Sequence, residues 1–404
     1  MAGLQIRNVK AILTSPGEGS IQKRLIVVKI DTSEPGLYGL GCATFTQRHR
    51  AVATVVDDYL NPLLIGRDPS RIEDIWHTVH VNAYWRSGPV MNNALSGVDM
   101  ALWDLKGKLA GMPVYQLLGG KCREAVAVYR HADGSEPREV EDNARRFIEQ
   151  GCRYVRVQMG GYGGKARPTD RLESSLSGAF YDPDAYARSV PVLFEHLRNT
   201  IGFGTELLHD VHERLVPIRA VQLAKELEPY RLFFLEDLLP PEQIEWFEMV
   251  RRQCTTPLAM GELFVNANEY KPLVLGRLID FIRCHVSAIG GLTPARKLGT
   301  LCEAFGIRTA WHGPGDVSPI GHAANLHLDL SSPNFGVQEW AGFSEIEQEV
   351  FPGCPELIDG YAYVNDRPGF GVDINEELAA KYPCPDGVLE WTQTRINDGS
   401  PAYP

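Results

Sequence analysis

Three acidic residues recur in this chain at equal intervals. Asp210, Glu236 and Glu262 follow one another at steps of 26 residues, and each closes a short apolar run that is typical of a buried β-strand. A helix-like stretch follows each run, as in a parallel β/α barrel, where residues at the C-terminal strand ends converge on one mouth. Three carboxylates there suit a hard divalent cation, so the spacing predicts a Mg²⁺ site and a metal-assisted reaction.

Two histidines are placed to transfer protons beside this predicted metal site. His212 comes two residues after Asp210, so the two side chains share one face provided that the strand continues that far. His312 ends another apolar run and enters a Gly-Pro-Gly turn, with Asp316 four residues later. We expect both rings at the mouth. The alternatives are a surface histidine at a strand end for His212 and a loop-capping histidine for His312.

Polar residues at other strand ends could recognise an anionic substrate. Arg156 and Arg283 each lie at the end of an apolar run, and a guanidinium binds a carboxylate through two parallel hydrogen bonds. A structural ion pair is the alternative for either arginine. His131 ends the first run of the series, and Glu339 ends the last, where its carboxylate could accept a hydrogen bond from a substrate hydroxyl.

The elements that must carry these residues occupy the middle of the chain. From about Ala125 to about Gly342, short apolar runs alternate with amphipathic helical stretches. This alternation implies parallel strands joined by right-handed crossovers. We therefore predict a closed α/β barrel over residues 125–342, with the metal site at its mouth.

The two ends of the chain have a different character. The sequence of residues 1–124 predicts a separate α+β domain. Gly111 and Pro113 should end the longest helix of this domain. Residues 343–404 show no clear period and are expected to pack back on this first domain. The apolar face of the long helix is predicted to contain Leu95, Val98, Leu102, Leu105 and Leu109.

The composition limits the partners and the compartment. A net charge of −11 and a pI of about 5.5 argue against nucleic acid or an anionic membrane as the main partner. The sequence has no long apolar stretch that would predict a transmembrane helix, and its N-terminus lacks the apolar core of a signal peptide. The eight cysteines form no CxxC pair and are predicted to be free thiols. We therefore expect a cytoplasmic protein.

One long polar segment interrupts the barrel pattern. Residues 159–185 are rich in glycine and follow the second predicted strand. Loops of this length in a compact domain are usually functional or disordered. The segment predicts a lid over the mouth, with a plain insertion as the alternative.

These features resemble the enolase superfamily, in which a capping α+β domain covers a modified TIM barrel. Within it, the chain is most similar to the mannonate dehydratase group of acid-sugar dehydratases, which includes D-galactonate and D-gluconate dehydratase-like members. The resemblance implies that the C-terminal segment completes the capping domain and that the protein is a homo-oligomer. The stretches that carry it are PLLIGRDPSRIEDIWHTVHVNAYWRSGPV, VDMALWDLKGK, VYQLLGGKCREAVAVYRHADG, LLHDVHERLVPI, WHGPGDVSPIGHAANLHLDL and PNFGVQEW.

The resemblance also implies a mechanism. Mg²⁺ would bind the carboxylate and the 2-hydroxyl of a sugar acid, a base would remove the proton α to the carboxylate, and the metal would stabilise the ene-diolate. An acid would then assist loss of the 3-hydroxyl, which leads to a 2-keto-3-deoxy acid. On this basis His212 is the acid or base. The residues implied to contact substrate are His131, Arg283, His312, Asp316 and Glu339.

The chain departs from the group's pattern at the base. Efficient mannonate dehydratases use an Arg–Tyr pair, and Arg156 matches the arginine. The position twelve residues later is Pro168, and Tyr162 is the nearest tyrosine. A general base contributes about 10²–10⁴-fold in rate, so we expect low activity on mannonate.

Three further features differ from related enzymes. Thr46 stands where the resemblance implies an asparagine in the N-terminal substrate loop. Arg156 and Gln158 replace the Lys-x-Lys pair of racemases and cycloisomerases, which weighs against racemisation and lactonisation. His285 stands where related enzymes place an aspartate behind a catalytic histidine, so that dyad is absent.

We predict a hydro-lyase that dehydrates a sugar acid of the D-mannonate or D-gluconate type with Mg²⁺. One alternative is action on another aldonate such as galactonate. Another is a metal-binding family member with little or no dehydratase activity.

Overall fold

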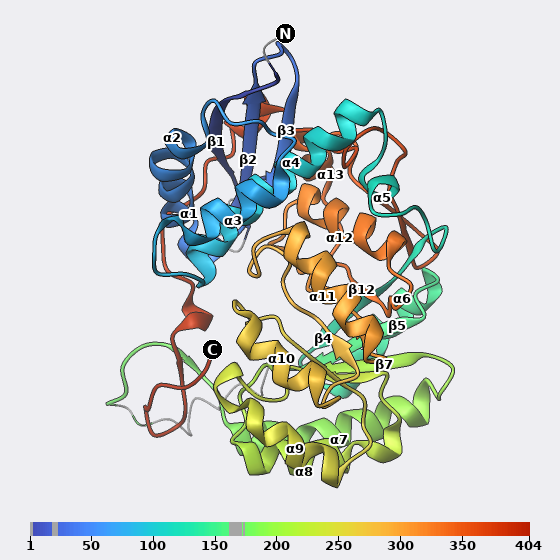
Figure 1. Cartoon of the computed structure of the whole chain (residues 1–404). Helices are drawn as coiled ribbons and strands as arrows, with labels where there is room; N and C mark the ends of the chain where they lie inside the picture. The colour runs from blue at the N-terminus through green and yellow to red at the C-terminus, as the bar shows by residue number, and fades with distance from the viewer. Residues whose placement is uncertain (1–2, 18–22, 161–171, 173) are drawn as a thin grey trace.

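The barrel strands carry the candidate site, and they form a closed parallel ring. The computed structural model describes residues 3–17, 23–160, 172 and 174–404. From the first to the seventh, the barrel strands (Figure 1) pair in chain order, and the eighth pairs with the first. A bridge between Thr309 and Phe335 connects the seventh strand to the residues before the eighth, which closes the barrel. The strands are β4 (Val126–Gly134), β5 (Tyr154–Met159), β7 (Glu206–Asp210), β8 (Phe234–Glu236), β9 (Leu258–Met260), β10 (Phe281–Ile282), β11 (Arg308–Thr309) and β12 (Gln338–Glu339).

Amphipathic helices surround this ring and connect its strands. Their apolar faces supply much of the main hydrophobic core. The helices are α6 (Pro137–Glu149), α7 (Pro183–Thr200), α8 (Pro217–Glu226), α9 (Phe247–Gln253), α10 (Ala267–Leu275), α11 (Leu292–Ala304) and α12 (Pro319–Ser331). The predicted α/β barrel is confirmed.

The N-terminal domain is a small antiparallel sheet packed against one long helix. Its sheet has the order β1-β2-β3. The helix α4 packs so closely on β3 that a side chain at Gly41 would overlap the main-chain oxygen of Gly97, and only glycine allows this approach. The bounds are β1 (Ile6–Thr14), β2 (Leu25–Thr32), β3 (Tyr38–Cys42), α1 (His49–Thr54), α2 (Asn61–Leu64), α3 (Ile72–Asn82), α4 (Pro89–Ala110) and α5 (Val114–Leu117).

The long helix follows the sequence prediction with one exception. It ends as predicted at Gly111, which adopts the left-handed conformation (φ 65°) that favours glycine at this position. The apolar residues from Leu95 to Leu105 are buried, but Leu109 is 49% exposed. The prediction for Leu109 is wrong because the last turn of α4 extends beyond the core.

The C-terminal segment returns to the N-terminal domain, as expected for a capping domain that it completes. Lys10 forms an ion pair with Glu376, and the Phe370 amide donates to the buried Asp104 carboxylate. The final residues then cross to the barrel mouth, where β15 pairs with β6. The remaining elements are β6 (Ala179–Phe180), α13 (Glu345–Val350), β13 (Glu356–Ile358), β14 (Tyr361–Tyr363), α14 (Glu376–Ala379) and β15 (Thr394–Arg395).

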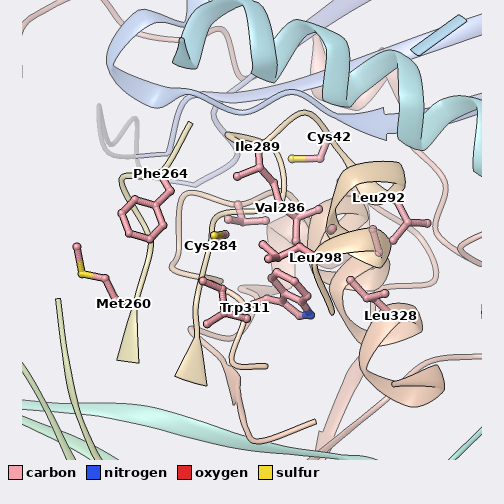
Figure 2. Close-up of a cluster of buried hydrophobic side chains, with 14 of the residues drawn as sticks. Cys42, Met260, Phe264, Cys284, Val286, Ile289, Leu292, Leu298, Trp311 and Leu328 are labelled. Carbon is pink, nitrogen blue, oxygen red and sulfur yellow. The ribbon is translucent and has the colours of Figure 1, made fainter. Parts of the chain in front are cut away.

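An apolar cluster joins the capping domain to the barrel. Figure 2 shows Cys42 from β3 next to Ile289, in one cluster with Leu292 and Leu328 of the barrel domain. The cluster continues to Trp311, next to a predicted site residue. It therefore fixes the position of the capping domain relative to the barrel mouth.

Two other expectations concern the whole chain. The cysteines are free thiols, as predicted. Among the residues that the structure describes, we find no helix with the length and apolar character needed to cross a membrane.

Candidate active site

The candidate site is the layer of side chains directly above the apolar interior of the barrel. Successive inward-facing residues of a strand are two positions apart, so the residues of one interior layer indicate which residues form the next layer. The apolar layer contains Tyr129, Leu208, Phe234, Ala259, Phe281, Ala310 and Val337. Two positions farther along the chain, the polar layer includes His131, Asp210, Glu236, Arg283, His312 and Glu339.

The three predicted metal ligands lie at adjacent strand ends. Asp210 ends β7 and pairs in register with Glu236, which ends β8, and Glu262 follows β9. Nη1 of Arg156 lies 3.2 Å from both Asp210 Oδ2 and Glu236 Oε1. Nη1 of Arg283 lies 2.5 Å from Glu262 Oε2. The two guanidinium groups therefore lie between the carboxylates.

The two arginines determine how the three carboxylates are arranged. Within the described part of the chain, no three His, Cys, Asp or Glu side chains are grouped around one point as metal ligands. Arg156 instead supplies the positive charge between Asp210 and Glu236, and Arg283 forms an ion pair with Glu262. The three carboxylates are linked through the two arginines rather than through a common centre.

The charge of the site nevertheless suits a divalent cation. Burial raises the pKa of Asp210 well above its usual range, and the negative charges of Glu236 and Glu262 raise it further. Burial also raises the pKa of Asp237 to about 7, although Arg283 opposes this shift. Buried carboxyl groups that repel one another are stabilised by added positive charge, and carboxylate oxygens are preferred ligands of Mg²⁺. The donor set therefore fits the predicted ion.

His212 reaches the site by a different path from the predicted one. The strand β7 ends at Asp210, and His212 and Glu213 both adopt left-handed conformations, with φ of 53° and 62°. The condition that the strand continues to His212 is not met, because the His212 amide donates to Asp210 Oδ1 and the chain turns. The ring still faces the site, with Nε2 3.7 Å from Glu262 Oε1.

The tail of the chain holds the other side of the His212 ring. Nδ1 of His212 lies 2.9 Å from the main-chain oxygen of Pro404, and the Trp391 ring packs edge-on against the imidazole. Burial lowers the pKa of His212 to about 4, so the ring is neutral near pH 7. A main-chain oxygen only accepts, so Nδ1 carries the proton and Nε2 presents a lone pair to the site.

His312 faces two carboxylates with one nitrogen and a histidine with the other. Its Nε2 lies 3.3 Å from Glu262 Oε2 and 3.7 Å from Glu339 Oε2. Its Nδ1 lies 3.0 Å from Nδ1 of His285. Burial lowers the pKa of His285 to about 3, so His285 is neutral.

The predicted substrate contacts His131, Arg283 and Glu339 lie together. His131 Nε2 is 2.9 Å from Glu339 Oε1, and Arg283 Nη2 is 3.0 Å from Glu339 Oε2. Although burial acts in the opposite direction, His312 and Arg283 hold the pKa of Glu339 well below its usual range. Glu339 is therefore an ionised acceptor at the base of the mouth.

Thr46 is the predicted contact that the capping domain provides. It begins a short 3-10 helix (Thr46–Arg48) and is buried. Burial raises the pKa of Asp316, and both His312 and the Thr46 hydroxyl oppose this shift. Thr46 and Asp316 therefore meet where the capping domain covers the barrel mouth.

The second member of the predicted base pair is not placed. Tyr162 and Pro168 lie outside the described residues, as does the middle of the predicted lid. The end of that segment forms β6, and the Tyr181 amide beyond it donates to Arg395 of the tail. Arg156 is placed at the metal ligands, and the lid stays a prediction.

Two residues of the candidate site were not predicted from the sequence. The Tyr129 hydroxyl donates to Glu236 Oε2 (3.2 Å) and accepts from Arg283 Nη2 (3.1 Å). Asp237 Oδ2 accepts from Arg283 Nη1 at 2.6 Å, and its other oxygen accepts from the Gly261 amide. Tyr129 lies two positions before His131, so strand alternation could have indicated it. Asp237 could not be found this way, because a positive φ of 41° turns it inward beside Glu236.

Sequence profiles of known families match both parts of the chain. The family described as enolase C-terminal domain-like matches residues 139–378. The mandelate racemase / muconate lactonizing enzyme N-terminal domain matches residues 7–119. The chain therefore belongs to the enolase superfamily.

Individual relatives identify a family within this superfamily. A D-galactonate dehydratase family member of Musicola paradisiaca is 59% identical over 421 residues, and one of Enterococcus gallinarum is 52% identical over 405 residues. Both matches cover 100% of each chain, so this protein belongs to the D-galactonate dehydratase family.

Solved structures agree with this assignment. The crystal structure of an enolase from Pantoea ananatis with bound D-gluconate and Mg superposes with a TM-score of 0.96, at 58% identity and 100% coverage of both chains. A mandelate racemase/muconate lactonizing enzyme from Jannaschia sp. superposes with a TM-score of 0.83 over 96% of this chain and 99% of its own. At 23% identity, this second match supports the fold alone.

Proposed function

We propose that this protein is a Mg²⁺-dependent acid-sugar dehydratase that converts an aldonate into a 2-keto-3-deoxy acid. The observation that carries the proposal is the group of three carboxylates at adjacent strand ends, with the imidazoles of His212 and His312 facing it. The relatives named as D-galactonate dehydratase family members, and the related structure with D-gluconate and Mg, support the same reaction class.

Asp210, Glu236 and Glu262 would hold the ion, in place of the Arg156 guanidinium that now lies between the first two. When bound, Mg²⁺ would supply Lewis-acid stabilisation of the negative charge that develops on the substrate carboxylate. Tyr129 and Asp237 support this set by fixing Glu236 and Arg283 through the contacts described above.

His212 is the residue that we assign to proton transfer at C2. Its Nδ1–H is held by the Pro404 oxygen, so Nε2 presents its lone pair toward the site and would take the proton as the C2–H bond breaks. The C3–O bond then breaks, the departing oxygen takes this proton, and water leaves. The resulting enol tautomerises to the 2-keto-3-deoxy acid. Tyr162 with Arg156 is the second candidate for the proton acceptor.

The remaining polar residues would bind and orient the sugar acid. His131, His312 and Glu339 surround one side of the mouth, and Thr46 of the capping domain meets Asp316 of the barrel above it. Arg283 is shared by several carboxylates and would hold them in place. We propose D-gluconate, D-mannonate and D-galactonate as the first substrates to test, with low activity on mannonate.

The test is an aldonate panel assayed with Mg²⁺ and after chelation. Formation of 2-keto-3-deoxy acid and exchange of the C2 proton in D₂O should both require the ion. His212→Gln should lower the rate by about 10²–10⁴-fold, whereas Glu73→Gln, on an exposed face of the capping domain, should not.

The outcomes separate the proposal from its alternative. Absence of both product and C2 exchange with every aldonate would overturn the dehydratase function. Thermal stabilisation by an aldonate without turnover would favour a sugar-acid-binding protein instead. A homo-oligomer and a cytoplasmic location stay predictions.

A further inference from the structure

We propose that His285 is a positioning residue that fixes His312 as the Nε2–H tautomer, so that His312 donates a hydrogen bond to an oxygen of the sugar acid. The identity of that ligand rests on the proposed function. The position of the proton is a property of the protein without ligand and can be measured separately.

The first observation is the contact between the two rings. The Nδ1 atoms of His285 and His312 are 3.0 Å apart, with the ring planes inclined by 60°. Two imidazole nitrogens at this distance share one proton, so one ring donates and the other accepts. The question is which ring carries the proton.

The surroundings of His285 indicate which of its nitrogens carries the proton. Its neighbours Cys284 and Val286 belong to the apolar cluster that includes Trp311 (Figure 2). Nε2 of His285 is buried and has no hydrogen-bond partner among the described residues. A proton on Nε2 would be a buried donor without an acceptor, which is unfavourable. The proton of the neutral His285 therefore lies on Nδ1 and is donated to His312.

The surroundings of His312 lead to the same result. Because its Nδ1 accepts, its own proton lies on Nε2, which faces Glu262 Oε2 at 3.3 Å and Glu339 Oε2 at 3.7 Å. A lone pair on Nε2 would instead face two acceptor oxygens. Both ends of the His285–His312 pair thus favour one tautomer.

This tautomer assigns His312 a role different from that of His212. An imidazole that carries a proton on Nε2, toward the mouth, donates a hydrogen bond and does not accept a proton there. His212, whose Nδ1–H is held by Pro404, has the opposite arrangement. The two histidines are therefore not interchangeable, and His285 is the residue that separates their roles.

The test is the tautomer of His312 in protein labelled with ¹⁵N-histidine. Two-bond nitrogen–proton couplings distinguish Nδ1–H from Nε2–H, and His312→Gln assigns the signals by their loss. We expect Nε2–H in the wild type. His285→Asn, whose amide can still donate, should keep this pattern, whereas His285→Asp, which accepts, should move the proton to Nδ1.

Two results would overturn the inference: Nε2 without a proton in the wild type, or an unchanged His312 pattern in a folded His285→Asp variant. Thermal melting checks that each variant folds. With an aldonate that the wild type dehydrates, His285→Asp should lose roughly fivefold in kcat/KM through KM, the effect of one neutral hydrogen bond, and His285→Asn should not. Failure of all aldonates would reject the proposed function but leave the tautomer result decisive.

Discussion

The Nδ1 atom of His212 is hydrogen-bonded to the main-chain oxygen of Pro404 at 2.9 Å, although the two residues are 192 positions apart in the chain. The tail that brings Pro404 to this point is anchored by the β15–β6 pairing and contacts the His212 ring through Trp391. The orientation of a candidate catalytic histidine thus depends on residues that belong to neither the barrel nor the capping domain.

Truncation of the tail should therefore reduce turnover. We expect a chain that stops after Leu389 to lose at least about tenfold in kcat/KM, because the imidazole loses the acceptor that orients it. Trp391→Ala should show a smaller loss in the same direction, measured by product formation. Tyr403→Ala removes a half-exposed side chain of the same tail and is the control. Full activity of a folded truncated chain would contradict the assignment.

Replacement of Arg156 should strengthen metal binding. The guanidinium is the positive group between Asp210 and Glu236, so Mg²⁺ must compete with it. We expect Arg156→Met to bind Mg²⁺ about tenfold more tightly by calorimetry, a difference of about 1.4 kcal/mol. Arg130→Met, which removes a guanidinium packed on Phe147, should leave the affinity unchanged. Weaker binding in Arg156→Met would show that the arginine does not occupy the ion's place.

Loss of the Tyr129 hydroxyl should weaken both stability and metal binding. Tyr129 is fully buried, and its hydroxyl bonds Glu236 and Arg283. Tyr129→Phe should lower the free energy of unfolding by about 1–3 kcal/mol, because a charged group loses a buried partner. Denaturant unfolding and Mg²⁺ titration measure the two effects. Tyr154→Phe, in the neighbouring strand, is the matched control, and equal effects of both variants would contradict the role of Tyr129.

The buried Asp99 should make stability depend on pH. Its carboxylate accepts from the Thr293 amide and hydroxyl, which connects α4 to α11, and burial raises its pKa to about 7. The folded protein therefore holds a proton that the unfolded chain releases near pH 4, so this contribution is present at low pH and is lost as pH rises through 7. The free energy of unfolding should fall by roughly a few kcal/mol through this group.

Asp99→Asn isolates this contribution because asparagine does not titrate. The difference in unfolding free energy between variant and wild type should shift in favour of the variant as pH rises from about 4 to about 7. The groups of the active site are common to both proteins and cancel in this difference. A difference that does not change with pH would contradict a raised pKa for Asp99.

Strand alternation explains why much of the site could be predicted from sequence. Each buried strand places an apolar residue in the barrel interior and a polar residue two positions later at the mouth, as Leu208 and Asp210 show. The rule needs only local sequence, so it also located Glu236, His131 and Glu339. It holds while the chain stays extended.

The contacts that escaped prediction depend on conformations or distances that local sequence does not encode. Asp237 and His212 reach the site through left-handed backbone conformations rather than along a strand. The insertion of Arg156 between two carboxylates follows from charge balance among side chains of three strands. The contact with Pro404 joins a barrel residue to the tail, 192 positions away in the chain, and no spacing rule could indicate it.

The position of the final residue has a practical consequence. Figure 1 shows the C-terminal tail beside the barrel and the strand β1 in the capping domain. Because the Pro404 oxygen contacts His212, an affinity tag or fusion partner joined after Pro404 would begin at the candidate active site. Recombinant protein intended for assay should therefore be tagged at its amino end.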